Sequence, residues 1–296
     1  MFSILKQTGK DFLDDDCPTM AASLAYYTVF SLPPLIVVIL LIASAAFSPA
    51  QVQEALQGQF ASVMGPRAGE AILAIFENAE RPGFSRGIAS LLAIGGLLLG
   101  ATGAFGQLQS ALNTAWEVKP DPDQGGLRNF ILKRVFSFGM ILGIALLLVV
   151  FLAVSAVISL IAEGSAVPEA LLHLFDAIVS VAVFTLLFGA MFRLLPDAKV
   201  AWRDVWVGAG VTTILFVAGK FALGFYLGRS NPGDAFGAAG SLAVMLVWIY
   251  YASMVLLMGA EFTRVWADSR GVGIEPEEGA IRVIRQKRPL ASEPRR

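Results

Sequence analysis

GSLAVMLVWIYYASMVLLMGAE, residues 240–261, is the stretch that decides the fold class, because no charge interrupts it before Glu261. A helix that crosses about 30 Å of hydrocarbon needs roughly 20 mostly apolar residues. A helix that is apolar all round must also be buried on every side, by lipid or by protein. We therefore predict that the residues near 237–264 form a transmembrane helix.

Five further segments of similar length and character precede this one. They lie near residues 20–47, 87–112, 135–162, 169–194 and 205–228. The composition agrees, since 56% of the residues are hydrophobic and 15% are charged, whereas soluble domains carry about 25% charged residues. The sequence predicts an all-α polytopic membrane protein, with six transmembrane helices in a bundle over residues 20–266.

Composition also argues against several classes of function. A net charge of -1 provides no basic domain, so we expect no nucleic-acid partner. Cys17 is the only cysteine, which rules out an intramolecular disulfide and any site of clustered cysteine ligands. Residues 1–19 lack the apolar core of a removable signal peptide and are predicted to be cytoplasmic or interfacial. Residues 267–296 are polar and carry a basic cluster, which predicts a flexible cytoplasmic tail that meets anionic lipid.

Lys and Arg residues are concentrated in alternate connectors, and this pattern predicts the orientation. The richer set of connectors holds Lys6, Lys10, Lys119, Arg128, Lys133, Arg134, Arg193, Lys199 and Arg203. The other set holds only Arg67, Arg81, Arg86 and Arg229. Because connectors rich in positive charge remain on the cytoplasmic side, we predict that both termini are cytoplasmic.

Two stretches within residues 51–79 are too polar to cross a bilayer but have helical periodicity, and Gly65-Pro66 separates them. Their apolar stripes are Val52, Leu56, Phe60, Val63 and Met64, and then Ala68, Ala71, Ile72, Ile75 and Phe76. We predict two amphipathic helices on the periplasmic face. They either pack against the outer ends of the spans or form a mobile lid over a cavity.

Ionisable residues inside a span are costly and tend to face a bundle interior or a cavity. Asp176 in the fourth span and Lys220 in the fifth lie at similar depths, roughly 10 Å and 12 Å below the outer edge. Their structural role would be a clamp between two helices, or a Lys220 that snorkels outward. The functional alternative is a polar cavity that receives a charged headgroup or relays protons.

Glu169 and His173 share one helix face with Asp176, at positions i, i+4 and i+7. Such a stripe is able to pass protons or to bind a metal. A solvated helix end or a structural hydrogen bond is the simpler account, so we predict no metal and no cofactor.

The first span carries Tyr26 and Tyr27 and then Pro33 and Pro34 in mid-segment. Prolines inside a helix remove backbone donors, and they bend or break it. Broken spans often line transport sites, which makes these residues candidates for a substrate path. The alternative is a kink that serves packing.

At the predicted cytoplasmic ends of the spans, Glu261 is expected to need an Arg partner because an isolated buried carboxylate is costly. Arg193, Arg203 and Arg264 lie near the same ends. We predict a network of these residues that anchors the last three spans or serves as a gate.

Four stretches carry a family resemblance: AASLAYYTVFSLPPL (21–35), LNTAWEV (112–118), FRLLPDAKVAWRDVWVGA (192–209) and GSLAVMLVWIYYASMVLLMGAE (240–261). Together they resemble the YihY/BrkB family of bacterial inner-membrane proteins, over nearly the whole chain except the tail. The resemblance implies a six-span envelope protein associated with transport, and in some members with lipid export or serum resistance. Phe236 departs from the Tyr of many members. The family, once labelled a ribonuclease, supplies no catalytic residues to transfer.

These observations favour an integral membrane transport protein of the bacterial inner (plasma) membrane, which moves a lipid or other amphiphilic or anionic substrate through a polar cavity. Membrane lipids are the expected partners, with a homo-oligomer or envelope-assembly partners as further options. The alternative class is a scaffold or partner subunit that transports nothing. We predict that the chain is not an enzyme, because a hydrolase or ribonuclease needs a cluster of catalytic groups in an accessible site.

Overall fold

The computed structural model describes residues 1–43, 48–79, 86–122, 169–230 and 240–283. These residues are mainly helical, as the sequence predicts. The helices are α1 (Phe2–Asp14), α2 (Cys17–Ala43), α3 (Pro49–Met64), α4 (Pro66–Ala79), α5 (Arg86–Ala115), α7 (Glu169–Leu194), α8 (Trp202–Ser230) and α9 (Gly240–Ser269). The predicted third span, near residues 135–162, lies outside the described part of the chain.

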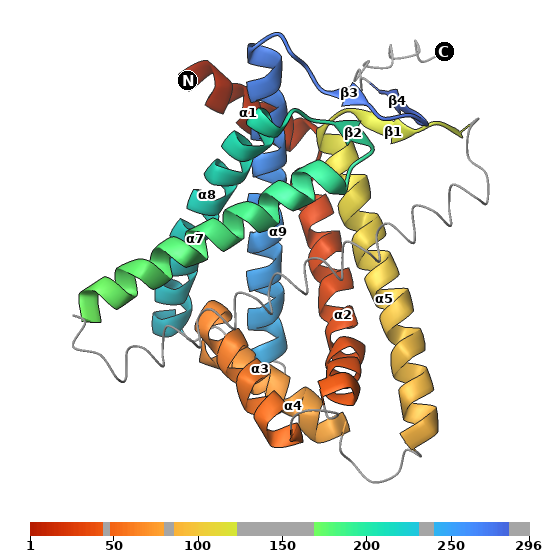
Figure 1. The fold of residues 1–296 in the computed structure, drawn as a ribbon, viewed down its shortest axis with the longest axis vertical. Coiled ribbons are helices and arrows are strands. Elements are labelled where there is room, and N and C mark those ends of the chain that lie inside the picture. Colours follow the sequence, from red (N-terminus) through yellow and green to blue (C-terminus); the bar gives the residue numbers. More distant parts are fainter. Residues whose placement is uncertain (44–47, 80–85, 123–168, 231–239, 284–296) are drawn as a thin grey trace, which may run out of the picture.

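Helix α9 is the centre of the arrangement (Figure 1), because it packs against α1, α2, α4, α5 and α8. Helix α2 lies between α9 and α5, and α7 packs on α8. Among the described helices, three are long and apolar enough to cross a membrane by length and composition: Ala177–Leu194 of α7, Trp202–Tyr226 of α8, and α9. The count of six spans and the side on which the termini lie remain predictions.

The segment predicted to form two amphipathic helices contains α3 and α4, which meet at Gly65. Gly65 has a φ of 95°, a conformation that glycine adopts without steric cost. The apolar stripe of α4 faces inward, with Ile72 and Phe76 fully buried against residues of α2 and α9 such as Ile36 and Met245. In the structure this stripe therefore packs against the ends of other helices. Figure 1 places α3 and α4 at the end of the bundle opposite α1.

Helix α2 corrects one expectation, because it continues through Pro33 and Pro34 to Ala43 without the break that the sequence suggested. Close contact with α5 supports it just before the prolines. A Cβ at Gly100 would overlap Ser31, and a Cβ at Gly103 would overlap the ring of Tyr27. The missing proline donors are thus tolerated inside a continuous helix that a neighbouring helix contacts closely.

Four short strands close the end of the bundle near α1, and the prediction of an entirely helical fold missed them. Strand β1 (Val118–Pro120) pairs antiparallel with β4 (Ala280–Arg282), and β2 (Ala198–Lys199) pairs antiparallel with β3 (Glu275–Pro276). The tail is therefore structured up to residue 283, which corrects the prediction of a flexible tail from residue 267. Strands of two or three residues are too short to leave a period of two in the sequence.

Helices α8 and α9 approach closely through a reciprocal pair of contacts. Gly208 of α8 lies against Thr263 of α9, and Gly259 of α9 lies against Thr212 of α8. Both threonine hydroxyls donate to a carbonyl of their own helix, to Gly259 O and Gly208 O respectively, at 2.7 Å. Small residues permit such close backbone approach between membrane helices.

We predict that Gly259→Ala lowers the stability of the protein, because the added Cβ would overlap Thr212 and overpacking costs about 1–3 kcal/mol. The measurement is the thermal unfolding midpoint in detergent. Gly210→Ala is the matched control, since no described atom lies within 4 Å of a Cβ at that position of α8. An equal midpoint for the two variants would contradict the close α8–α9 contact.

Candidate functional site

The candidate site lies at the end of the bundle where α1, the last turn of α5, the strands and the last turns of α9 meet (Figure 1). Arg264 of α9 is its hub. Its Nη2 lies 2.7 Å from Asp11 Oδ2 of α1 and 3.0 Å from Glu261 Oε2 of α9, and its Nη1 lies 3.0 Å from Glu117 Oε1. One guanidinium thus binds carboxylates from three separate parts of the chain. We call Asp11, Glu117, Glu261 and Arg264 the Arg264 cluster.

The Arg264 cluster is mostly removed from water. Glu261 is 0% exposed and Arg264 is 8% exposed. Removing the charge of Arg264 would leave Glu261 buried without a counter-charge, which is far more costly than the loss of a surface pair. Arg264 itself would keep Asp11 and Glu117 if Glu261 were removed. Cys17, at the start of α2, adds a thiol that donates to Glu261 Oε1 at 3.7 Å. The cluster therefore also ties the beginning of α2 to α9.

The chain geometry around Glu117 is set by its backbone. Its φ is 54°, which is uncommon for a residue other than glycine. This backbone conformation lies between the end of α5 and the start of β1. Trp116, which directly precedes Glu117, donates its Nε1–H to Ala260 O of α9 at 2.9 Å. The turn is further held by Val283 N, which donates to Glu117 O at 2.8 Å. Glu117 is thus directed toward Arg264 from a fixed position.

A second polar contact joins α5 to the loop between α7 and β2. Asn113 Nδ2 donates to Asp197 Oδ2 at 2.9 Å, and Asp197 N donates to Asn113 Oδ1 at 2.8 Å. Gln109 Nε2 donates to the other carboxylate oxygen at 3.3 Å. The two-way Asn113–Asp197 contact fixes both the side chain and the backbone of the loop. We call these three residues the Asn113 clamp.

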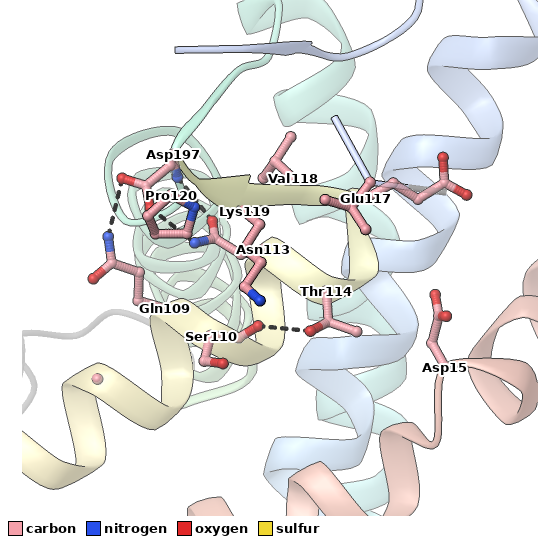
Figure 2. Close-up of a pocket in the computed structure, with 12 residues that line it drawn as sticks. Asp15, Gln109, Ser110, Asn113, Thr114, Glu117, Val118, Lys119, Pro120 and Asp197 are labelled. Atoms are coloured by element: carbon pink, nitrogen blue, oxygen red, sulfur yellow. Dashed lines mark hydrogen bonds between the residues drawn. The ribbon is translucent and has the colours of Figure 1, made fainter. Parts of the chain in front are cut away.

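Between the Arg264 cluster and the Asn113 clamp lies a cavity of about 520 Å³. Its lining consists of Asp15, Gly106, Gln109, Ser110, Asn113, Thr114, Glu117, Val118, Lys119, Pro120, Asp197 and Val283. Figure 2 shows Gln109 and Asn113 directed at Asp197, with Asp15 and Glu117 on the other side of the view. Three carboxylates and one lysine line it, so the cavity suits hydrogen-bonding and positively charged groups.

The structure brings together only some of the residues predicted for this end. Glu261 contacts Arg264 as its Arg partner. Arg193 instead donates from Nη1 to Val200 O at 2.7 Å and lies over the ring of Trp202, and Arg203 is exposed. The predicted four-residue network is therefore corrected, because the turn from α7 into β2 holds Arg193 beside its own loop.

The residues predicted for a substrate path lie apart from the cavity. Tyr26 and Tyr27 are exposed on α2, where Tyr26 packs on Phe30, and Pro33 is exposed as well. Lys220 is half-buried on α8. The side chains of Glu169, His173, Asp176 and Pro34 lie outside the described part of the structure. Pairing of Asp176 with Lys220 therefore stays a prediction.

Three important members of the site were not singled out from the sequence: Asp11, Glu117 and Asn113. Asp11 belongs to a short amphipathic segment, and nothing in that segment indicates contact with the last span. Glu117 and Asn113 lie in the quoted LNTAWEV stretch, where polar residues follow a long apolar span. That switch from apolar to polar residues was the one available signal. In the described residues, no group of three metal-ligating side chains occurs.

Long apolar helices closed at one end by buried ion pairs define an integral membrane protein of the helical-bundle class. Comparison with known families then gives a more specific result. The family model described as Virulence factor BrkB matches residues 8–281, and the chain belongs to that family. The resemblance seen in the sequence is thereby confirmed.

Relatives in several bacteria carry the name UPF0761 membrane protein. The one from Pseudomonas aeruginosa (strain LESB58) is 29% identical over 94% of this chain and 68% of its own length. The one from Vibrio parahaemolyticus is 30% identical over 88% of this chain and 81% of its own length. These names describe membrane proteins and mention no enzymatic activity. No solved structure matches this chain.

We predict that Arg264→Gln destabilises the protein by about 3–5 kcal/mol, because Glu261 would remain buried without a counter-charge. Denaturant unfolding in detergent measures the change. Arg282→Gln is the control on the same cluster, since Arg282 is half exposed and lies 3.7 Å from Glu117, and exposed pairs contribute about 0–1 kcal/mol.

The same cluster predicts a partial rescue. Adding Glu261→Gln to Arg264→Gln removes the unpaired carboxylate, so the double variant should be more stable than Arg264→Gln alone. The measurement is the double-mutant cycle over the two positions. Destabilisations by the two substitutions that simply add in the double variant would contradict direct coupling between Glu261 and Arg264.

Proposed function

We propose that this chain is a transport protein of the bacterial inner membrane that moves a lipid or another amphiphilic substrate. The observation that carries the proposal is the polar cavity between the Arg264 cluster and the Asn113 clamp. Its lining gathers amides, hydroxyls and carboxylates in one concave place, and such a set of groups suits a polar ligand. It gives a polar headgroup a place at the predicted cytoplasmic end, while the acyl chains stay in lipid.

The charges of the lining refine the class of substrate. Asp15 and Asp197 outnumber Lys119 among the lining residues even when Glu117 is counted as compensated by Arg264. This favours a headgroup that carries an amine over the purely anionic substrate considered from the sequence. Glu117 is shared, because its Oε1 binds Arg264 and its Oε2 faces Arg282. An amine that enters the cavity competes with Arg282 for Glu117. Binding is thereby linked to the contact between β1 and β4.

The proposed substrate path also has a half that lies nearer the periplasmic surface. We assign this half to Asp176 and Lys220, with His173 and Glu169 on the same face of α7 as Asp176. An acid and a base at matched depth give a headgroup or a proton an intermediate position between the two membrane surfaces. Tyr26, Tyr27 and the prolines of α2 belong to this proposal as side chains along the path.

One observation favours the alternative, a scaffold or partner subunit for envelope assembly. Arg264 is bound by three carboxylates, so the cluster already fulfils a structural role without any ligand. In that alternative, as in the transport proposal, both termini are cytoplasmic and a homo-oligomer or another envelope protein is a partner. The two functions differ in whether lipid moves.

We predict that Gly106→Leu reduces transport several-fold, because the leucine side chain would occupy part of the cavity. Gly106 lines the cavity and no described atom lies within 4 Å of a Cβ there, so the protein should fold. Gly95→Leu is the control, because it lies on the same helix and no described atom is within 4 Å of a Cβ there either. This variant should transport normally. The measurement is movement of fluorescent phosphatidylethanolamine and phosphatidylglycerol across proteoliposomes, with thermal midpoints to verify folding.

Two results are decisive for this experiment. No lipid movement by the wild type with either headgroup would reject transport of these lipids and favour the scaffold. Equal activity of Gly106→Leu and the wild type would reject the cavity as part of the route.

For the half of the path nearer the periplasm, Asp176→Ala and Lys220→Ala should each reduce lipid movement. A charge-swapped double variant that folds but does not transport would separate a role in transport from a role in clamping the two helices.

A further inference from the structure

Helix α1 has three distinct faces around its circumference. Ile4, Thr8, Asp11 and Phe12 form the inner face, which is turned toward the bundle and includes the buried Thr8 and Phe12. Phe2, Leu5, Gly9 and Leu13 follow one another at helical spacing on a second face. Lys6 and Lys10 lie beside that second face. An amphipathic helix that only covers a core needs a single apolar face, whereas α1 has a second apolar face that does not contact the core.

The inner face fixes how α1 is rotated. Asp11 Oδ2 accepts from Arg264 Nη2 at 2.7 Å, and Phe12 belongs to the same buried cluster as Trp116 and Leu112. α1 is therefore not free to roll and bury its second face against the protein. That second face points outward because the Arg264 cluster holds the first one inward.

The outward face is strongly apolar. Phe2 is 84% exposed, Leu5 is 55% exposed and Leu13 is 68% exposed. Burying a side chain of this size is worth about 1.5–3 kcal/mol, so leaving three of them in water sacrifices much of the stability that burial provides elsewhere. Something apolar must cover this face in the native environment.

The depth of α1 identifies that environment. Arg264 binds α1, and its neighbour Thr263 lies against Gly208 of α8. Gly208 lies about half a turn from Trp206 and roughly 1.7 turns from Trp202 along α8, and both tryptophans are exposed and stacked on each other. Exposed tryptophans at the end of a membrane helix are typical of the boundary between headgroups and acyl chains. α1 therefore lies at the level of this boundary.

We propose that α1 lies in the membrane interface and binds the anionic phospholipid surface of the bilayer. Phe2, Leu5 and Leu13 enter the boundary between headgroups and acyl chains, and Lys6 and Lys10 meet the phosphates. Lys6 and Lys10 put positive charge beside Phe2 and Leu5, whereas the exposed Asp14 and Asp16 follow Leu13. The first half of α1 is therefore the part that is complementary to an anionic surface. A second copy of the chain is a poorer occupant, because three side chains on a 13-residue helix offer far less than the roughly 800 Å² per partner of a stable interface.

The test uses the full chain in lipid nanodiscs, with an environment-sensitive fluorophore on a single cysteine. Cys17→Ala provides the background without native thiols. Leu5→Cys and Leu13→Cys report on the outward face, and Gln7→Cys, exposed on a different face of the same helix, is the control. Brominated phosphatidylcholine should quench the label at positions 5 and 13 several-fold more than at position 7, and aqueous iodide should show the reverse order.

The lysines are tested separately in nanodiscs with and without phosphatidylglycerol. Lys6→Gln and Lys10→Gln should each weaken the response of the label at position 5 to phosphatidylglycerol, by about fivefold per lysine. Equal iodide quenching at positions 5, 7 and 13 would overturn the interfacial position. Protection of positions 5 and 13 from both quenchers would mean that protein covers this face, and this also overturns the proposal. Lipid quenching that does not respond to phosphatidylglycerol would overturn the assignment to an anionic surface.

Discussion

The buried pair of Glu261 and Arg264 is the interaction on which this end of the molecule depends. A carboxylate with no exposure is tolerated only when a positive charge and hydrogen bonds compensate its loss of water. Arg264 also binds Asp11 and Glu117, so one compensated charge joins α1, α9 and the end of α5. The direction in which α1 lies and the point at which β1 begins both follow from this arrangement.

The cavity exists because two polar contacts keep its walls in place. The Arg264 cluster fixes Glu117 on one side, and the Asn113 clamp fixes Asp197 on the other. Between them, β1 pairs with β4, and Val283, which directly follows β4, is part of the lining. Either proposed function, transport or scaffolding, is compatible with this architecture. Only transport would require the cavity between these contacts. The carboxylates that line the cavity favour a headgroup that carries an amine.

The sequence predicted the helical class and the need of Glu261 for an arginine, because an acid at the end of an apolar stretch has few ways to be stabilised. It missed Asp11 and Glu117, since nothing in a connector indicates which distant charge will bind it. The two-residue and three-residue strands were also invisible, because pairing between Ala198 and Pro276 depends on tertiary structure alone. At Pro33 and Pro34, local chemistry favoured a break, whereas α2 continues through both prolines to Ala43.

In the proposed transport function, the cavity beside Asn113 and Glu117 receives the polar group of an amphiphile. The most direct measurement is an electron cryomicroscopy map of the full chain in nanodiscs that contain phosphatidylethanolamine. We predict headgroup density within hydrogen-bonding distance of the cavity carboxylates, continuous with acyl-chain density in the surrounding lipid. A map in which side chains of the protein itself fill this space completely would contradict the claim.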